Sequence, residues 1–198
     1  MMSGSQVDET DYSVDPGNKK NPRKRIVLAG IFLIILVSVG VYFLNYSGLQ
    51  SPMNEVLSSD PRNQGIKVSV HYDNYVDQSV IVYDMTDVAG TNSEADVFRV
   101  LLQFADKMQN ANVKRVKLAC RGKVKFWIAG DYFQKLGKEF GTQNPIYTTR
   151  TFPENTFKPD GSPGFSHWEG GFLGVTSNQL QDFNDFHAQW WLNDLSKT

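Results

Sequence analysis

The chain has 198 residues, of which 20 are Lys or Arg, 21 are Asp or Glu, and 40% are hydrophobic. This length allows one domain of ordinary size with short flanking segments, and it excludes a multidomain enzyme. A net charge of −1 argues against a general nucleic-acid-binding protein, so no nucleic-acid partner is predicted. The single cysteine, Cys120, excludes an internal disulfide and a cysteine-rich zinc site.

An apolar segment near the N-terminus predicts a membrane span. Residues 26–44 carry no charge, and only Gly30, Ser38 and Gly40 fall outside the hydrophobic set. As a helix with about 1.5 Å rise per residue, the segment is roughly 28 Å long, close to the thickness of a bilayer core. Because no small-x-small cleavage motif follows it, we interpret it as an uncleaved anchor. A cleaved signal peptide and a buried core helix are the alternatives.

The charges that flank this segment are asymmetric and predict its orientation. The flank before it holds five basic residues: Lys19, Lys20, Arg23, Lys24 and Arg25. On the other side the next basic residue is Arg62. This asymmetry indicates a single-pass protein of the cell membrane with a cytoplasmic N-terminus.

The chain is therefore expected to have four parts. They are a disordered cytoplasmic tail (1–25), a transmembrane anchor (26–44), a tether containing Pro52 and Pro61 (45–65), and an extracytoplasmic globular domain (66–198).

The globular part begins with the pattern of a β–α–β unit. Apolar and polar residues alternate over 66–72, and residues 80–83 are apolar on both faces, which is typical of a central strand. A capping box at Thr91–Glu94 predicts a helix whose apolar residues recur from Val97 to Met108. Two further alternating strands, 116–120 and 123–128, flank a two-residue turn at Arg121-Gly122.

Two more helices are predicted after these strands. Asp131 is expected to cap a short helix that ends near Gly137 or Gly141. A second capping box, at 176–179, predicts a final helix with His187 on its apolar stripe, where a core histidine is favoured over a metal ligand. The expected fold is therefore α/β or α+β, with a four- to five-stranded mixed sheet and about three helices.

The segment 142–175 is predicted to be a long loop because it is rich in Pro and Gly. Its His167, Glu169 and Asp160 are the catalytic candidates, since an imidazole and a carboxylate close in sequence serve proton transfer. Trp168 and Arg150 are binding candidates in the same segment. The alternative is a covering loop whose aromatic residues pack onto the sheet.

Known catalytic and cofactor motifs are absent from the sequence. It contains no Walker loop, no Gly-x-Gly-x-x-Gly, no His-Glu-x-x-His and no Gly-x-Ser-x-Gly. Asp84 and Asp87 follow a central strand and offer carboxylates to a divalent cation, but they lack a recognised phosphatase spacing. We therefore predict no cofactor and no metal site.

The polar faces of the predicted strands are basic. They carry Lys67, Arg115, Lys117, Lys123 and Lys125 beside the ring of Trp127. Of these, Lys117, Lys125 and Trp127 are candidates for binding an anionic polymer or lipid headgroup. In the alternative interpretation, which we prefer, the acidic C-terminal segment packs across this face.

Taken together, these features predict a binding or assembly domain anchored in the cell envelope, with a possible protein partner. The competing hypothesis is an envelope-associated hydrolase that uses the 142–175 segment.

Overall fold

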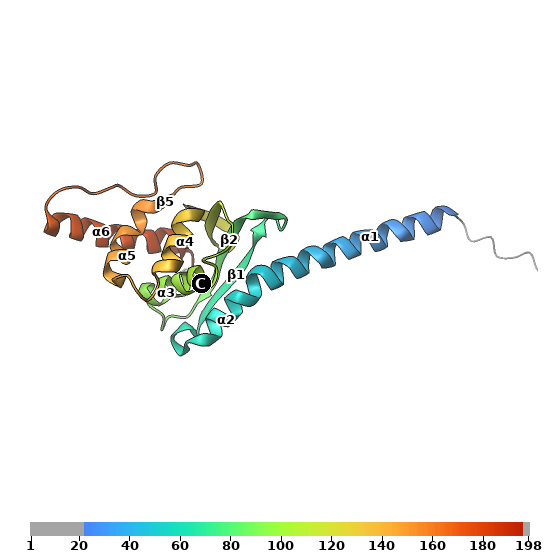
Figure 1. Ribbon diagram of the computed structural model, residues 1–198, viewed down its shortest axis with the longest axis horizontal. Helices are drawn as coiled ribbons and strands as arrows, with labels where there is room; N and C mark the ends of the chain where they lie inside the picture. Colours follow the sequence, from blue (N-terminus) through green and yellow to red (C-terminus); the bar gives the residue numbers. More distant parts are fainter. Residues whose placement is uncertain (1–21, 196–198) are drawn as a thin grey trace, which may run out of the picture. The chain divides into compact units, whose positions relative to one another are not determined.

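A computed structural model describes residues 22–195 (Figure 1). The chain divides into two compact units, Met1–Ser38 and Val39–Thr198. Most of the expected cytoplasmic tail, including Lys19 and Lys20, lies outside the described residues.

The apolar segment forms helix α1, Pro22–Asn45, as the sequence predicts. Apart from the partly buried Val41, its large apolar side chains are exposed, from 50% for Ile31 to 72% for Ile26. A continuous helical stretch, Arg23–Ser59, contains an 18-residue window that is apolar enough to cross a membrane and has none of its residues buried. An exposed apolar helix of this length is consistent with a membrane anchor and differs from the buried core helix that was the alternative.

The segment 45–65, which the sequence predicted to be a tether, is helical over most of its length. It forms a π-helical turn η1 (Tyr46–Gln50), helix α2 (Ser51–Ser59) and a 3-10 turn η2 (Pro61–Asn63). Leu49 and Met53 are completely buried in the domain core, and Val56 is 6% exposed. Pro61 occupies the first turn of the 3-10 element, where a missing N–H costs nothing. Pro52 lies where the π-helical turn passes into α2 and does not end the continuous helical stretch.

The second unit, Val39–Thr198, contains a mixed sheet whose strands lie in the order β1-β2-β3-β4-β5. Its strands are β1 (Ile66–Asp73), β2 (Asp77–Val88), β3 (Arg115–Cys120), β4 (Lys123–Ala129) and β5 (Thr156–Phe157). β2 and β3 pair in parallel, and the other neighbours are antiparallel. The predicted α/β or α+β fold with a four- to five-stranded mixed sheet is therefore confirmed, in the α+β form with five strands.

The two-residue turn between β3 and β4 is also confirmed. Arg121 and Gly122 have φ values of 49° and 78°, the left-handed pair of a type I′ hairpin turn.

The predicted helices are present, but their N-terminal caps differ from those expected. In α3 (Glu94–Lys107) the capping box joins Ser93 to Asp96, two residues later than the Thr91–Glu94 box. Asp131 lies inside the first turn of α4 (Gly130–Glu139), after Ala129 at the N-cap. The final helix α6 (Phe172–His187) begins before the 176–179 box, which therefore lies within the helix.

The predicted loop 142–175 is partly helical. It contains α5 (Pro145–Thr151), a 3-10 turn η3 (Pro153–Asn155) and the short strand β5. Asn144 accepts a hydrogen bond from the N–H of Ile146 at 2.9 Å, and Pro145 takes the first helical position. Asn-Pro is thus an N-terminal helix signal here, within a segment that the sequence analysis predicted to be a loop.

Helices α3, α4, α5 and α6 gather on one side of the sheet (Figure 1). Tyr83 of β2 contacts Phe104 of α3 and Trp190 of the π-helical segment η4 (Ala188–Leu192), and all three are completely buried. The chain continues into a last short helix, α7 (Asn193–Leu195). The core therefore lies between the sheet and these helices.

Candidate binding groove

An apolar groove lies between α3, α4 and α5. Its volume is about 340 Å³, at the lower end of the ~300–1,000 Å³ range of ligand pockets. Its apolar lining consists of Ala95, Phe98, Leu102, Leu136, Phe140 and Pro145. The polar rim includes Arg62, Glu139, Gln143 and Thr149.

The close packing of α3 and α4 creates one wall of the groove. A Cβ atom on Gly137 would come within 2.2 Å of the backbone oxygen of Ala105, so only glycine allows this approach. Gly141, with φ of +79°, then turns the chain into the segment that leads to α5. Gly137 therefore allows α3 and α4 to pack closely, and Gly141 allows the chain to turn toward α5, so that all three helices line the groove.

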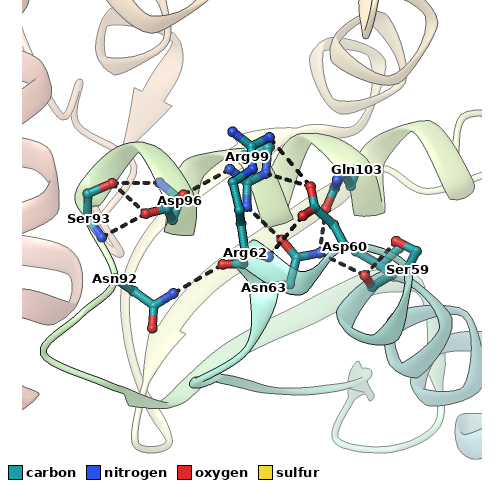
Figure 2. A network of polar contacts seen from close by, with 10 residues as sticks. Ser59, Asp60, Arg62, Asn63, Asn92, Ser93, Asp96, Arg99 and Gln103 are labelled. Atoms are coloured by element: carbon teal, nitrogen blue, oxygen red, sulfur yellow. Dashed lines mark hydrogen bonds and ion pairs between the residues drawn. The ribbon is translucent and has the colours of Figure 1, made fainter.

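A polar network centred on Arg99 fixes the end of the groove (Figure 2). Arg99 donates to Asp96 at 2.8 Å and to Asn63 at 2.9 Å, and its Nε lies 3.6 Å from Asp60. Asn63, which is 1% exposed, also donates to the backbone oxygen of Val56 and to Gln103, both at 2.8 Å. These contacts join η2 to the first turns of α3.

The charges at this end are balanced. The backbone N–H of Arg62 holds the pKa of Asp60 below its ordinary value, and the Arg62 and Arg99 guanidinium groups act in the same direction. The backbone N–H and hydroxyl of Ser93, followed by Arg99, lower the pKa of Asp96. Both carboxylates therefore stay ionised opposite the two arginines, and the four charges offset one another. The feature of the groove that can select a ligand is then its apolar lining and its shape.

The apolar surface continues beyond the groove onto α5. Ile146 is 64% exposed and Tyr147 is 48% exposed. Ile146 and Thr149 are three residues apart on the helix, so Ile146 lies next to the groove rim. The sequence interpretation missed this site because it treated α5 as a loop. The Asn144-Pro145 pair was the available signal.

The predicted catalytic residues do not form one cluster. His167 contacts Glu154 of η3, with Nδ1 2.8 Å from Oε2, and not Glu169, which is exposed. Asp160 accepts from the N–H and hydroxyl of Ser162 at 2.9 and 2.7 Å, which lower its pKa and make it part of a local turn.

A separate cavity of about 650 Å³ adjoins the His167–Glu154 pair. Polar side chains, including Lys158 and Ser166, contribute to its lining. His167 and Glu154 therefore share a site that sequence spacing alone did not suggest.

The predicted binding residues of the 142–175 segment contact the C-terminal helix. The indole N–H of Trp168 donates to Asp182 at 2.7 Å, and Arg150 Nε donates to Gln179 at 2.9 Å. Both contacts tie the segment to α6, whereas the covering-loop alternative placed its aromatic residues on the sheet.

The predicted basic face is partly neutralised from within the sheet. Lys117 pairs with Asp73 at 2.6 Å, and Lys67 pairs with Asp87 at 2.9 Å. Of the acidic C-terminal segment, Asp194 reaches this group of residues and pairs with Lys125 at 2.7 Å.

The aromatic packing also differs from the preferred prediction, in which the acidic C-terminal segment packs across the basic face of the sheet. Trp127 stacks on Phe157 at 4.3 Å and receives the Arg115 guanidinium at 4.1 Å. Phe186 and Trp190 instead pack on the core side, against Phe126 and Tyr83. The C-terminal aromatic stripe therefore covers the core face of the sheet.

The two carboxylates that were expected to follow the central strand lie within β2 and have other partners. Asp84 accepts from the N–H of Gly122 at 2.9 Å, and Asp87 pairs with Lys67. Within residues 22–195, no group of three or more His, Cys, Asp or Glu side chains is arranged to hold a metal ion.

His187 lies in the core, as the sequence favoured. It is completely buried, and its Nδ1 accepts from Trp191 Nε1 at 2.8 Å. Burial lowers the pKa of His187 to about 3, which keeps the ring neutral at ordinary pH. The side chain is therefore a structural residue at the centre of an aromatic cluster.

Comparison of the chain with protein-family models, with curated proteins and with solved structures found no match.

Proposed function

We propose that this is a single-pass membrane protein whose extracytoplasmic domain binds a partner polypeptide in the cell envelope through the α3–α4–α5 groove. The exposed apolar helix α1 supports the anchor. The basic residues that precede it, against none between Leu44 and Arg62, support a cytoplasmic N-terminus.

The observation that carries the binding role is the apolar groove with its continuation on α5. A small ligand in the 340 Å³ groove would leave Ile146 and Tyr147 in water. A polypeptide that places apolar side chains in the groove also covers these neighbours, and exposed apolar surface of this kind marks protein contact sites. The groove therefore fits a partner protein better than a small molecule.

The anchor and its orientation are tested by cysteine labelling in intact cells. Cys120 is 1% exposed and burial raises the pKa of its thiol, so the native cysteine should stay unlabelled. A membrane-impermeant maleimide should label Lys138→Cys, at an exposed position of α4, and should not label Ser5→Cys in the N-terminal segment. The reverse pattern would mean the opposite orientation, and release of the protein by alkaline carbonate would exclude an integral anchor.

The groove is tested by photo-crosslinking from Thr149 in the full-length protein. We expect one protein to crosslink at this position, and we expect Ile146→Asp to abolish the crosslink because it places a charge on the apolar rim. Leu180→Asp is the matched control, since Leu180 is also an exposed apolar residue of a helix, at 42%.

The captured protein must then bind the purified full-length chain in a manner that Ile146→Asp weakens. Equal crosslinking in both aspartate variants, or no binding by the purified chain, would contradict a partner site in the groove.

A hydrolase remains the second candidate because of one contact, the His167–Glu154 pair beside the 650 Å³ cavity. A carboxylate that orients an imidazole is an arrangement used in general base catalysis. His167→Ala and Glu154→Gln should then abolish hydrolysis of envelope material, whereas Glu169→Ala and Asp160→Ala should leave it unchanged. Equal hydrolysis by wild type and His167→Ala would exclude this role.

A further inference from the structure

The end of helix α1 is joined to the tip of the β1–β2 hairpin. Asn45, the last residue of α1, is 6% exposed and its amide donates to the backbone oxygens of Val41 and Tyr75, both at 2.8 Å. Its side-chain oxygen accepts from the N–H of Tyr72, also at 2.8 Å. The hairpin tip therefore lies beside the last turn of the apolar segment.

The tip exposes apolar side chains in a strained turn. Asn74 and Tyr75 have φ values of 49° and 64°, a left-handed conformation that asparagine adopts more readily than most residues but that is unfavourable for tyrosine. Tyr75 is 56% exposed, Val76 is 66% exposed, and the Tyr75 ring stacks on His71 at 4.5 Å. The stacking on His71 leaves more than half of the Tyr75 side chain exposed, and Val76 beside it is more exposed still.

The adjacent helical turns expose similar side chains. Tyr42 is 68% exposed and Tyr46 is 44% exposed, and their rings stack at 6.1 Å. Tyrosines gather where a protein crosses from hydrocarbon to water, because the ring is apolar and the hydroxyl is polar. Tyr42, Tyr46 and Tyr75 thus lie near one another at the boundary of the apolar run.

Charged groups near the tip fit the headgroup layer and not the hydrocarbon core. Asp73 is paired with Lys117, and Asp77 accepts from the N–H and hydroxyl of Ser79 at 3.0 and 2.7 Å. Lys114, which is exposed, donates its N–H to the backbone oxygen of Ser79 at 2.7 Å and so lies at this end of the sheet. A lysine at this level attracts anionic headgroups.

We propose that the tip of the β1–β2 hairpin, residues 74–77, lies in the headgroup region of the bilayer with Tyr75 and Val76 in contact with lipid. This inference rests on the proposed membrane anchor. The Asn45 hydrogen bonds suit this position because they satisfy backbone groups that water reaches less easily there. The contact holds the domain against the bilayer surface.

The test uses single-cysteine variants of the full-length protein, labelled with an environment-sensitive fluorophore. The protein is reconstituted into vesicles of phosphatidylcholine and phosphatidylglycerol that contain spin-labelled quencher lipids. Val76→Cys reports on the hairpin tip. Lys123→Cys is the matched control, since it is an exposed residue beside the turn at the other end of the sheet, and Leu36→Cys reports on the apolar helix.

We expect a blue shift and a loss of emission at position 76 with quenchers placed near the headgroups, and no change at position 123. If position 76 gives the same emission as position 123, and Leu36→Cys is quenched by spin labels at the bilayer centre, the hairpin contact is overturned and the anchor remains. Absence of quenching at position 36 would overturn the anchor itself, and the hairpin inference with it.

A second measurement avoids a labelled cysteine at position 76. With the Leu36→Cys reporter in place, Val76→Asp should make the hairpin tip more accessible to protease, because a carboxylate is disfavoured against lipid. Unchanged accessibility relative to Val76→Ala would also count against lipid contact.

Discussion

Helices α3 and α6 pack in the same core but are held by different forces. The buried face of α3 is largely aliphatic, with Val97, Val100 and Leu101 at 0% exposure, and a complete capping box begins the helix. The end of α6 is packed among aromatic rings around the neutral His187, and its N-cap, Gly171, makes no side-chain hydrogen bond.

Because of this difference, the contributions of the two helices to the stability of the fold should respond differently to pH. The buried face of α3 carries no titratable side chain of its own. Its Phe98 meets His187 with ring centroids 6.3 Å apart, so below neutral pH the packing of α3 should depend on pH less than that of α6. The packing of α6 requires His187 to stay neutral, and its Nε2 has no hydrogen-bond partner among the described residues. We therefore expect steric changes to act most strongly at α3 and pH to act most strongly at α6.

The largest expected effect is steric and lies between α3 and α4. Gly137→Ala should lower the free energy of unfolding by about 3 kcal/mol or more, because its Cβ would meet the backbone oxygen of Ala105 at 2.2 Å and neither backbone can move easily. Urea unfolding of the full-length protein in detergent micelles, followed by tryptophan fluorescence, measures the change.

The control for this variant is Gly90→Ala. An added Cβ at Gly90 meets no atom within 4 Å, and this substitution should leave stability nearly unchanged. A similar loss in both variants would mean that the α3–α4 approach is not the tight contact described here.

The next effect is a pH dependence that arises from His187. Its folded-state pKa of about 3 lies below the ordinary value near 6.5, so between these values the unfolded chain binds a proton that the folded chain does not. Stability is therefore complete above about pH 6.5 and falls as the pH decreases, by roughly 1.4 kcal/mol per pH unit. We expect a loss of about 2 kcal/mol between pH 6.5 and pH 5 in the same urea assay.

His187→Phe is the variant that isolates this effect. It keeps an aromatic ring in the cluster and removes the titrating group, so the slope between pH 5 and 6.5 should disappear. Loss of the acceptor for Trp191 Nε1 should lower stability by about 1–3 kcal/mol at every pH. A slope that persists in His187→Phe would assign the pH dependence to other groups. The aspartates with lowered pKa values, such as Asp60 and Asp96, act at lower pH.

The sequence predicted the regular elements with strong periodicity. Strict alternation over 66–72 and 123–128, and the helical spacing from Val97 to Met108, gave β1, β4 and α3 close to their observed bounds. In these segments local propensity and core packing favour the same structure, so a single sequence is sufficient.

The prediction was wrong where proline was treated as a break in structure. Pro61 and Pro145 each begin a helical element, and Pro52 lies within a continuous helical stretch. The apolar residues Leu49, Met53 and Val56 were the helical pattern that the tether prediction overlooked. The groove could not be predicted, because it depends on three helices meeting at Gly137 and on where α5 begins. The His167–Glu154 contact joins residues 13 positions apart through loop geometry that no spacing rule specifies.

The smallest expected effect tests the capping difference between the two helices. Ser93→Ala removes the hydroxyl that accepts from the N–H of Asp96 at 3.2 Å and donates to its carboxylate at 2.7 Å, and it should cost about 1 kcal/mol. Asp96 also holds Arg99 at 2.8 Å, so loss of the cap should loosen the network at the end of the groove. Hydrogen exchange at the first turn of α3 and at Asn63 should therefore increase together in Ser93→Ala. An increase confined to α3 would show that the cap and the Arg99 network are energetically separate, and that the groove end does not depend on how α3 begins.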